Sequence, residues 1–124
     1  MTRNLLNANL DLEIIVSKRD ESSIVRLRGR LNVDSSPALR DRLLPLLRAQ
    51  PPQAVILDFS DVSYVDSSGI ATVVEGLGMA RMRQTTLCLQ GLQGRLLHLF
   101  QVTGISTLFE KNGCTSASSV SQVS

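Results

Sequence analysis

A short apolar run followed by an amphipathic stretch constrains the fold of this chain more than any other feature. Residues 54–59 (Ala-Val-Ile-Leu-Asp-Phe) have the length and composition of a central buried strand. After the polar segment 60–66, which predicts a loop, apolar residues recur at helical spacing over about 68–83. Parallel strands need a crossover connection, which is usually a helix, so a buried strand followed by a helix is typical of α/β proteins. We therefore expect an α/β fold.

The rest of the chain extends this pattern. Six further segments carry strand or helix signals, and in chain order they are a strand at 12–17, a strand at 24–28, a helix that starts at 34–37, a strand at 86–89, a helix at 95–102 and a last strand at 105–109. Pro45 predicts a kinked or shortened first helix. The order predicts one domain over 12–110, with a small mixed sheet of four to five strands flanked by helices. Residues 1–11 form a lead segment, and the composition of the Ser-rich tail 111–124 predicts disorder.

The scarcity of certain residue types excludes several functions. Among 124 residues there are one histidine, two cysteines, three phenylalanines and one tyrosine. No zinc-ligand spacing can be assembled from them, and they offer no stacking platform for single-stranded nucleic acid. The net charge is only +2, and Arg26, Arg28 and Arg30 alternate along a predicted strand as a solvated face would. We therefore expect no metal, no cofactor and no direct nucleic-acid partner.

Hydropathy along the chain predicts where the protein resides. No apolar run approaches 18 residues, so no segment is expected to span a membrane as a helix. The first residues lack the apolar stretch of a secretory signal peptide. We expect a cytoplasmic protein.

The segment Asp66-Ser67-Ser68-Gly69 opens the second predicted helix and carries the candidate chemistry. A serine hydrolase of the elbow type needs a glycine two residues before its nucleophile, and neither serine has one. The chain also lacks the glycine-rich loops that hold nucleotide phosphates. A structural interpretation stays open, in which either serine caps the helix and Gly69 only allows tight packing. The catalytic interpretations fail, and we expect that the protein is not an enzyme.

The remaining chemical interpretation makes a serine the substrate of another enzyme. Asp58 lies at a predicted strand end, but it lacks the neighbouring acids and the late lysine of an aspartyl phosphoacceptor. A phosphate on Ser67 would lie near the unpaired N–H groups of a helix N-terminus. Asp66, with Asp61 or Asp58, would then complete a strongly anionic patch that a partner fitted to the neutral hydroxyl would reject.

These motifs together resemble the STAS domain family, the sulphate-transporter and anti-sigma-factor-antagonist domains. The resemblance runs from about Leu12 to Phe109, and its specific core is Leu57-Asp58-Phe59-Ser60-x-Val62-x-x-Val65-Asp66-Ser67-Ser68-Gly69-Ile70. Supporting features are Gly29-Arg30-Leu31 and the late helix that ends at Gly104. Many relatives place an aspartate where this chain has Asn32, which keeps the turn-forming amide oxygen but loses the charge.

The resemblance implies partner switching. The unphosphorylated protein binds an anti-sigma factor and releases the sigma factor. The anti-sigma factor is also a serine kinase, which inactivates the protein by phosphorylation, and a serine phosphatase restores it. By motif position the phosphoacceptor is Ser67, with Ser68 as the second candidate, while Asp66, Ser68, Gly69 and Asp58 belong to the motif and partner surface.

Two alternatives within the same fold stay open. One is an accessory subunit of a lipid-transporting ABC system, and the other is a scaffold in a signalling complex. The acceptor position in the transport subunits is often threonine, so Ser67 favours the antagonist. A weak homodimer is compatible with any exposed helix face.

Overall fold

A computed structural model describes residues 11–49 and 54–111 of the chain. Most of the predicted lead segment 1–11 and tail 111–124 therefore lies outside the described residues. The elements, in chain order, are β1 (Leu12–Arg19), β2 (Ser22–Leu31), α2 (Ser36–Arg48), β3 (Ala54–Val65), α3 (Ser67–Arg83), β4 (Leu87–Gln90), α4 (Gly94–Val102) and α5 (Ile105–Lys111).

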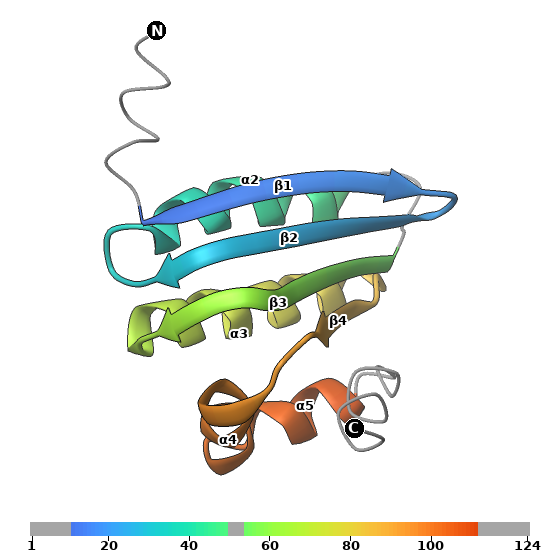
Figure 1. Ribbon diagram of the computed structural model, residues 1–124. Coiled ribbons are helices and arrows are strands. Elements are labelled where there is room, and N and C mark those ends of the chain that lie inside the picture. The colour runs from blue at the N-terminus through green and yellow to red at the C-terminus, as the bar shows by residue number, and fades with distance from the viewer. Residues whose placement is uncertain (1–10, 50–53, 112–124) are drawn as a thin grey trace, which may run out of the picture.

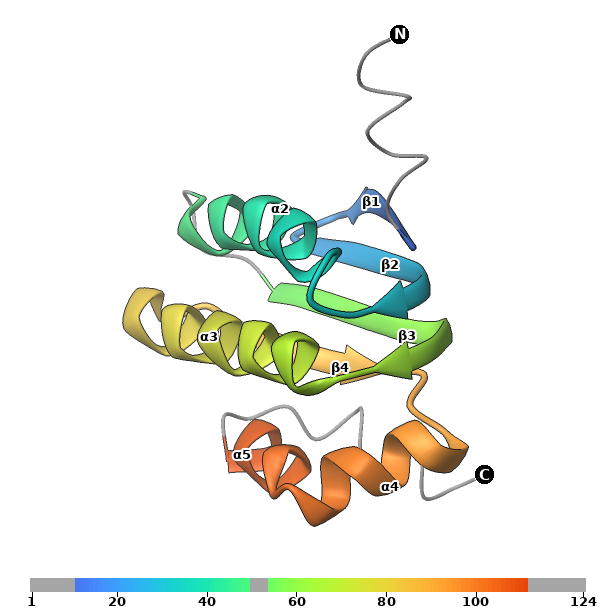
Figure 2. The same ribbon diagram turned by 90° about the vertical axis from the view of Figure 1, so that its left-hand side faces the viewer.

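The four strands form one mixed sheet in the order β1-β2-β3-β4. The hairpin β1–β2 is antiparallel, and β2–β3 and β3–β4 are parallel. Each parallel pair is joined through a helix, α2 or α3, and both of these helices cover the same face of the sheet (Figures 1 and 2). The predicted α/β class and mixed sheet are confirmed, with four strands.

The helices α2 and α3 pack on the sheet through apolar side chains at helical spacing. The buried residues on these two faces include Leu39, Leu43, Leu47, Val73, Leu77 and Ala80. Gly76 lies at the contact between the helices, because a Cβ there would come within 2.7 Å of Leu43 Cδ2. A Cβ on Gly78 would meet nothing within 4 Å, so this glycine costs the helix about 1 kcal/mol relative to alanine without a packing reason inside the domain.

The segment predicted as a loop, 60–66, was assigned wrongly. Strand β3 continues to Val65, and its buried side chains include the neighbours Asp58 and Phe59, then Val62 and Val65. The register with β2 shifts between Arg26 and Arg28, as at a β-bulge, so burial does not alternate with a period of two. Strand β2 likewise runs past Gly29, where φ is +115° and Asp11 O lies at the position that a Cβ would occupy, so a glycine is required there.

The last predicted strand, 105–109, is also wrong, because these residues belong to the helix α5. Its β-branched composition favours a strand, but the buried residues are Ile105 and Phe109, four positions apart on one helix face. Helices α4 and α5 lie beyond β4 (Figure 1). Phe100 on α4 packs edge-to-face on Phe59, with ring centroids 5.5 Å apart, and so joins this layer to the core.

Helix α2 begins at Ser36, within the predicted start at 34–37, but its cap and its length past Pro45 differ from expectation. The Ser35 hydroxyl makes no cap hydrogen bond to the helix, and Pro37 lies in the first turn of α2. Pro45 does not end the helix, which continues to Arg48. The exposed position of Pro45 places its ring on the solvent side of α2.

Candidate functional site

The candidate site lies where β2 and β3 end side by side. Their parallel pairing brings Leu31 opposite Val65, and the Asp66 N–H donates a 3.1 Å hydrogen bond to the Leu31 carbonyl. Because the carboxyl ends of two parallel strands lie at the same edge of the sheet, the start of α3 lies beside the loop that leads into α2 (Figure 2). Two segments about 35 residues apart in sequence thus share one surface.

Asp66, and neither serine, caps helix α3. Its backbone is extended, and its Oδ1 accepts hydrogen bonds from the N–H groups of Ser68 at 2.9 Å and Gly69 at 3.1 Å. Two of the unpaired donors at the helix N-terminus are satisfied in this way, and the carboxylate charge lies at the positive end of the helix dipole. The interpretation in which a serine caps the helix is therefore wrong.

Ser67 is the first residue of α3 and is exposed. Its hydroxyl makes no hydrogen bond within residues 11–49 and 54–111. Ser68 is only half-buried, and its carbonyl accepts a 3.1 Å hydrogen bond from the Thr72 hydroxyl. Of the two serines, Ser67 therefore presents its hydroxyl more openly, on a backbone that the Asp66 cap holds in place.

Gly69 is required by close packing. A Cβ at this position would come within 2.7 Å of Leu31 Cγ and 2.9 Å of Val65 Cγ1. Leu31 and Val65 are both buried in the core and cannot move aside freely. The glycine therefore lets the first turn of α3 lie directly on the ends of β2 and β3.

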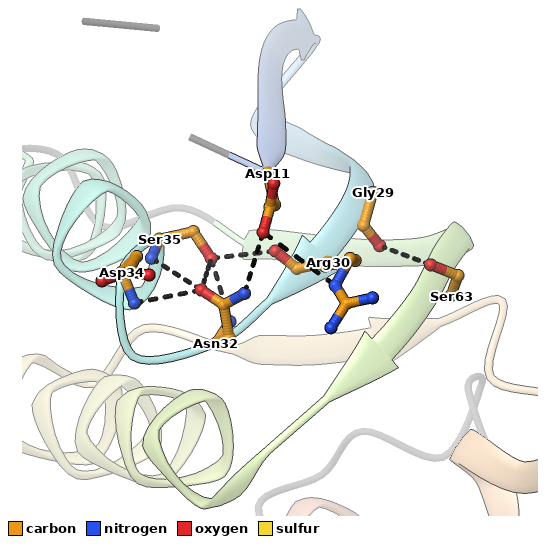
Figure 3. Close-up of polar contacts among 7 residues, drawn as sticks. All are labelled: Asp11, Gly29, Arg30, Asn32, Asp34, Ser35 and Ser63. Atoms are coloured by element: carbon orange, nitrogen blue, oxygen red, sulfur yellow. Dashed lines mark hydrogen bonds and ion pairs between the residues drawn. The ribbon is translucent and has the colours of Figure 1, made fainter. Parts of the chain in front are cut away.

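A hydrogen-bonded loop between β2 and α2 forms the other half of this edge (Figure 3). The Asn32 side-chain oxygen accepts hydrogen bonds from the N–H groups of Asp34 at 3.0 Å and Ser35 at 3.1 Å, and its amide nitrogen donates to Asp11 at 3.1 Å. The buried Ser35 hydroxyl donates to the Arg30 carbonyl at 2.8 Å. Asparagine supplies a donor and an acceptor at once, which an ionised aspartate cannot do.

Arg30 and Tyr64 form an exposed pair on the same edge, which was not predicted. The guanidinium of Arg30 lies 4.7 Å from the centre of the Tyr64 ring, and its Nε lies 3.9 Å from Asp11 Oδ2. Tyr64 lies two residues before Asp66, so its presence near the motif was visible in the sequence. Its partner was not, because the pair forms only when β2 and β3 lie in register.

Asp58 is not brought together with Asp66. The two lie eight residues apart along β3 and the residue after it, which corresponds to about 26 Å of extended strand. Asp58 is buried, and its carboxylate accepts hydrogen bonds from the Ser60 N–H and hydroxyl and from Arg26 Nε. Burial alone would raise the pKa of Asp58, but the Ser60 hydrogen bonds and the Arg26 charge together lower it below its usual value. The hydrogen bonds of Asp58 to Ser60 and Arg26 therefore indicate that Asp58 stabilises the β-bulge between β2 and β3.

The described part of the chain contains no group of three or more His, Cys, Asp and Glu side chains arranged to hold a metal ion. Within the same residues, no helix is both long and apolar enough to cross a membrane.

Comparison with known proteins bears on this site. A family model described as "Mlab, STAS domain" matches residues 14–110. The chain belongs to the STAS domain family. It is 33% identical over 106 residues to the anti-sigma-B factor antagonist of Bacillus subtilis (strain 168). The aligned region covers 85% of this chain and 91% of that relative. An anti-sigma-B factor antagonist of Listeria monocytogenes is 29% identical over 102 residues, with coverage of 82% and 89%.

Solved structures of STAS domains have the same fold. The anti-sigma factor antagonist SpoIIAA in its unphosphorylated form matches with a TM-score of 0.62 at 19% identity, over 72% of this chain and 82% of that one. The phosphorylated form of SpoIIAA from Bacillus gives 0.64 at 19% identity, over 77% and 86%. A putative anti-sigma factor antagonist from Thermotoga maritima gives 0.70 at 16% identity, over 76% and 80%.

Proposed function

We propose that this STAS protein is an anti-sigma factor antagonist that works by partner switching, with Ser67 as its phosphoacceptor. In its unphosphorylated form it binds an anti-sigma factor and so releases the sigma factor. The observation that carries the proposal is the exposed Ser67 hydroxyl on the first turn of α3, held by the Asp66 cap. The relatives named anti-sigma-B factor antagonist support the same function. This activity belongs in the cytoplasm, where sigma factors act.

The chain supplies a substrate hydroxyl and a docking surface, and we assign it no catalytic step. The anti-sigma factor acts as the serine kinase and transfers the γ-phosphoryl group of ATP to Ser67 Oγ. A separate serine phosphatase hydrolyses the phosphoserine and restores the binding form. None of these steps needs a metal or a cofactor held by this chain.

The chemistry of the site explains how one phosphate switches binding. The phosphate adds a charge of about −1.5 to −2 at neutral pH. Two of the N–H donors in the first turn of α3, those of Ser68 and Gly69, already bind the Asp66 carboxylate, so fewer donors remain for a phosphate. The new charge is therefore poorly neutralised within the chain, and it repels a partner surface fitted to the neutral hydroxyl. A penalty of about 2.8 kcal/mol weakens binding roughly a hundredfold.

The proposal is tested by mixing the protein with ATP, Mg²⁺ and the cognate serine-kinase anti-sigma factor, and by mapping phosphate with mass spectrometry. We expect one phosphate on Ser67. Ser67→Ala should abolish it, and the matched control Ser68→Ala should retain it. Phosphate on Ser68 alone would move the acceptor by one residue. A chain that no cognate kinase modifies, and that instead copurifies with an ABC ATPase, would contradict the proposal.

A further inference from the structure

Strand β1 forms an open edge of the sheet in the described part of the chain. It pairs with β2 on one side, and within residues 11–49 and 54–111 no strand pairs with its other side (Figure 1). The opposite edge of the sheet differs, because helices α4 and α5 lie beyond β4. An open edge presents unpaired backbone N–H and C=O groups, which form a template for pairing with another strand.

One hydrogen bond determines which backbone groups of β1 point outward. The Arg30 N–H donates to the Asp11 carbonyl at 2.8 Å, and the register with β2 continues without a shift over the whole of β1. Because hydrogen-bonded and non-hydrogen-bonded pairs alternate in an antiparallel pair, the odd-numbered residues of β1 direct their backbone groups to β2. The even-numbered residues direct theirs to the open edge, and these residues are Leu12, Ile14, Val16 and Lys18.

The sequence of β1 lacks the features that normally block pairing at such an edge. Proteins protect edge strands by making them short, or with proline, bulges or inward-pointing charges. Strand β1 is eight residues long, contains no proline and pairs with β2 without a bulge. Its centre, Ile14-Ile15-Val16, is apolar. Ile14 and Val16 pack against the core, so Ile15 lies on the face of the sheet that α2 and α3 do not cover, where it is 39% exposed.

The charges along β1 make the strand complementary to itself. Asp11 and Glu13 lie at its start, and Lys18 and Arg19 lie at its end. When two copies of β1 run antiparallel, the acidic start of each copy meets the basic end of the other. Parallel pairing would instead place like charges opposite each other, which is destabilising. The edge therefore favours a second copy of this chain, in the antiparallel direction.

We propose that two copies of the protein pair along β1 about a two-fold axis at Ile15, so that their sheets become one continuous sheet. This register opposes Leu12 to Lys18, and Ile14 to Val16, so every outward backbone group of β1 finds a partner. A shift by two residues in either direction would leave some of these groups unpaired. Ile15 then packs on Ile15 of the second copy, which removes exposed apolar surface from water.

This homodimer is separate from the proposed function and does not depend on it. Helix α3, which begins at Ser67, contacts β3 and β4 and lies toward the β4 edge of the sheet (Figure 2). A two-fold axis perpendicular to the sheet keeps the helices of both copies on the same face. Each copy therefore keeps its own Ser67 outside the interface, and the dimer forms through a strand edge rather than through an exposed helix face.

The test measures self-association of the full chain by analytical ultracentrifugation over a wide range of protein concentration. Ile15→Lys places two like charges opposite each other at the axis. Val16→Pro removes an outward N–H but no hydrogen bond to β2, which is the position on an edge strand where proline is tolerated. Val102→Lys is the matched control, because this valine is 65% exposed on α4. The melting temperature of each variant verifies that it folds.

We expect wild type to shift from monomer to dimer as the concentration rises. Ile15→Lys and Val16→Pro should each raise the dimer dissociation constant at least tenfold, and Val102→Lys should stay within twofold of wild type. If Val16→Pro does not fold, Ile15→Lys decides, because it changes an exposed side chain. A wild type that stays monomeric, or a dimer that Ile15→Lys leaves intact, would overturn the proposal. Either result would leave phosphorylation of Ser67 and its effect on partner binding untouched.

Cross-linking tests the register. The Cα atoms of a non-hydrogen-bonded antiparallel pair lie about 4.5 Å apart, which is within the range that a disulfide spans. Mild oxidation with diamide should therefore convert Ile15→Cys to a covalent dimer. Ser17→Cys, on the same face but away from the axis, should not exceed the level of wild type, which has two cysteines of its own. Equal cross-linking of the two variants, or preferential cross-linking of Ser17→Cys, would overturn the pairing about Ile15.

Discussion

The Asp66 cap makes the sharpest prediction about how the site is built. Asp66→Ala removes an acceptor that binds two backbone donors, the N–H groups of Ser68 and Gly69. Loss of an N-cap costs about 0.5–2 kcal/mol, and loss of the carboxylate at the helix dipole adds about 0.3–1 kcal/mol. Asp66 is only half-buried, so water recovers part of this loss. We expect a loss of about 1–2 kcal/mol in the free energy of unfolding.

Asp66→Asn is the matched control, since asparagine is as good an N-cap but carries no charge. Chemical denaturation at pH 7 should order the free energies of unfolding as wild type, then Asp66→Asn within about 1 kcal/mol, then Asp66→Ala. The denaturant dependence, which reports the surface exposed on unfolding, should be unchanged. If Asp66→Ala were as stable as wild type, the cap would not stabilise α3. If asparagine and alanine were equally destabilising, the effect would come from charge alone.

Three further changes test other parts of the structure. Gly69→Ala should destabilise the fold by about 1–3 kcal/mol in the same denaturation assay, because its methyl group collides with buried side chains, and a neutral result would refute the close packing. The lowered pKa of Asp58 contributes stability that is present at neutral pH and is lost as the pH falls below about 4, so Ser60→Ala should cost more stability at pH 7 than at pH 2. An equal cost at both pH values would contradict this linkage. The exposed Arg40–Glu75 pair should give a coupling energy below about 1 kcal/mol in a double-mutant cycle, and a larger value would show that the pair is less screened than its exposure suggests.

Much of the fold was predictable because hydrophobic spacing reports burial directly. The segments around β1, β2, β4, α2, α3 and α4 were predicted in type and order. The error at 60–66 has a local cause, since the β-bulge near Asp58 replaces alternation by buried residues about three apart, at Phe59, Val62 and Val65. The error at 105–109 arose because composition favoured a strand while the burial of Ile105 and Phe109 follows a helix.

The sequence predicts which segment carries the site, but it does not predict which side chains from other strands lie beside that segment. The order of strand end, Asp66, two serines and glycine places Ser67 at a helix start from sequence alone. Which side chain caps the helix depends on backbone angles, and both serines were plausible caps. The pairing of Arg30 with Tyr64 depends on the register between strands, which a single sequence does not determine.

The central claim is that a phosphate on Ser67 controls partner binding. The most direct measurement is the affinity of the protein for its cognate anti-sigma factor before and after stoichiometric phosphorylation, with the modified site verified by mass spectrometry. We predict that phosphorylation of Ser67 weakens binding about a hundredfold, which corresponds to about 2.8 kcal/mol. An affinity that is unchanged when Ser67 is fully phosphorylated would contradict the account.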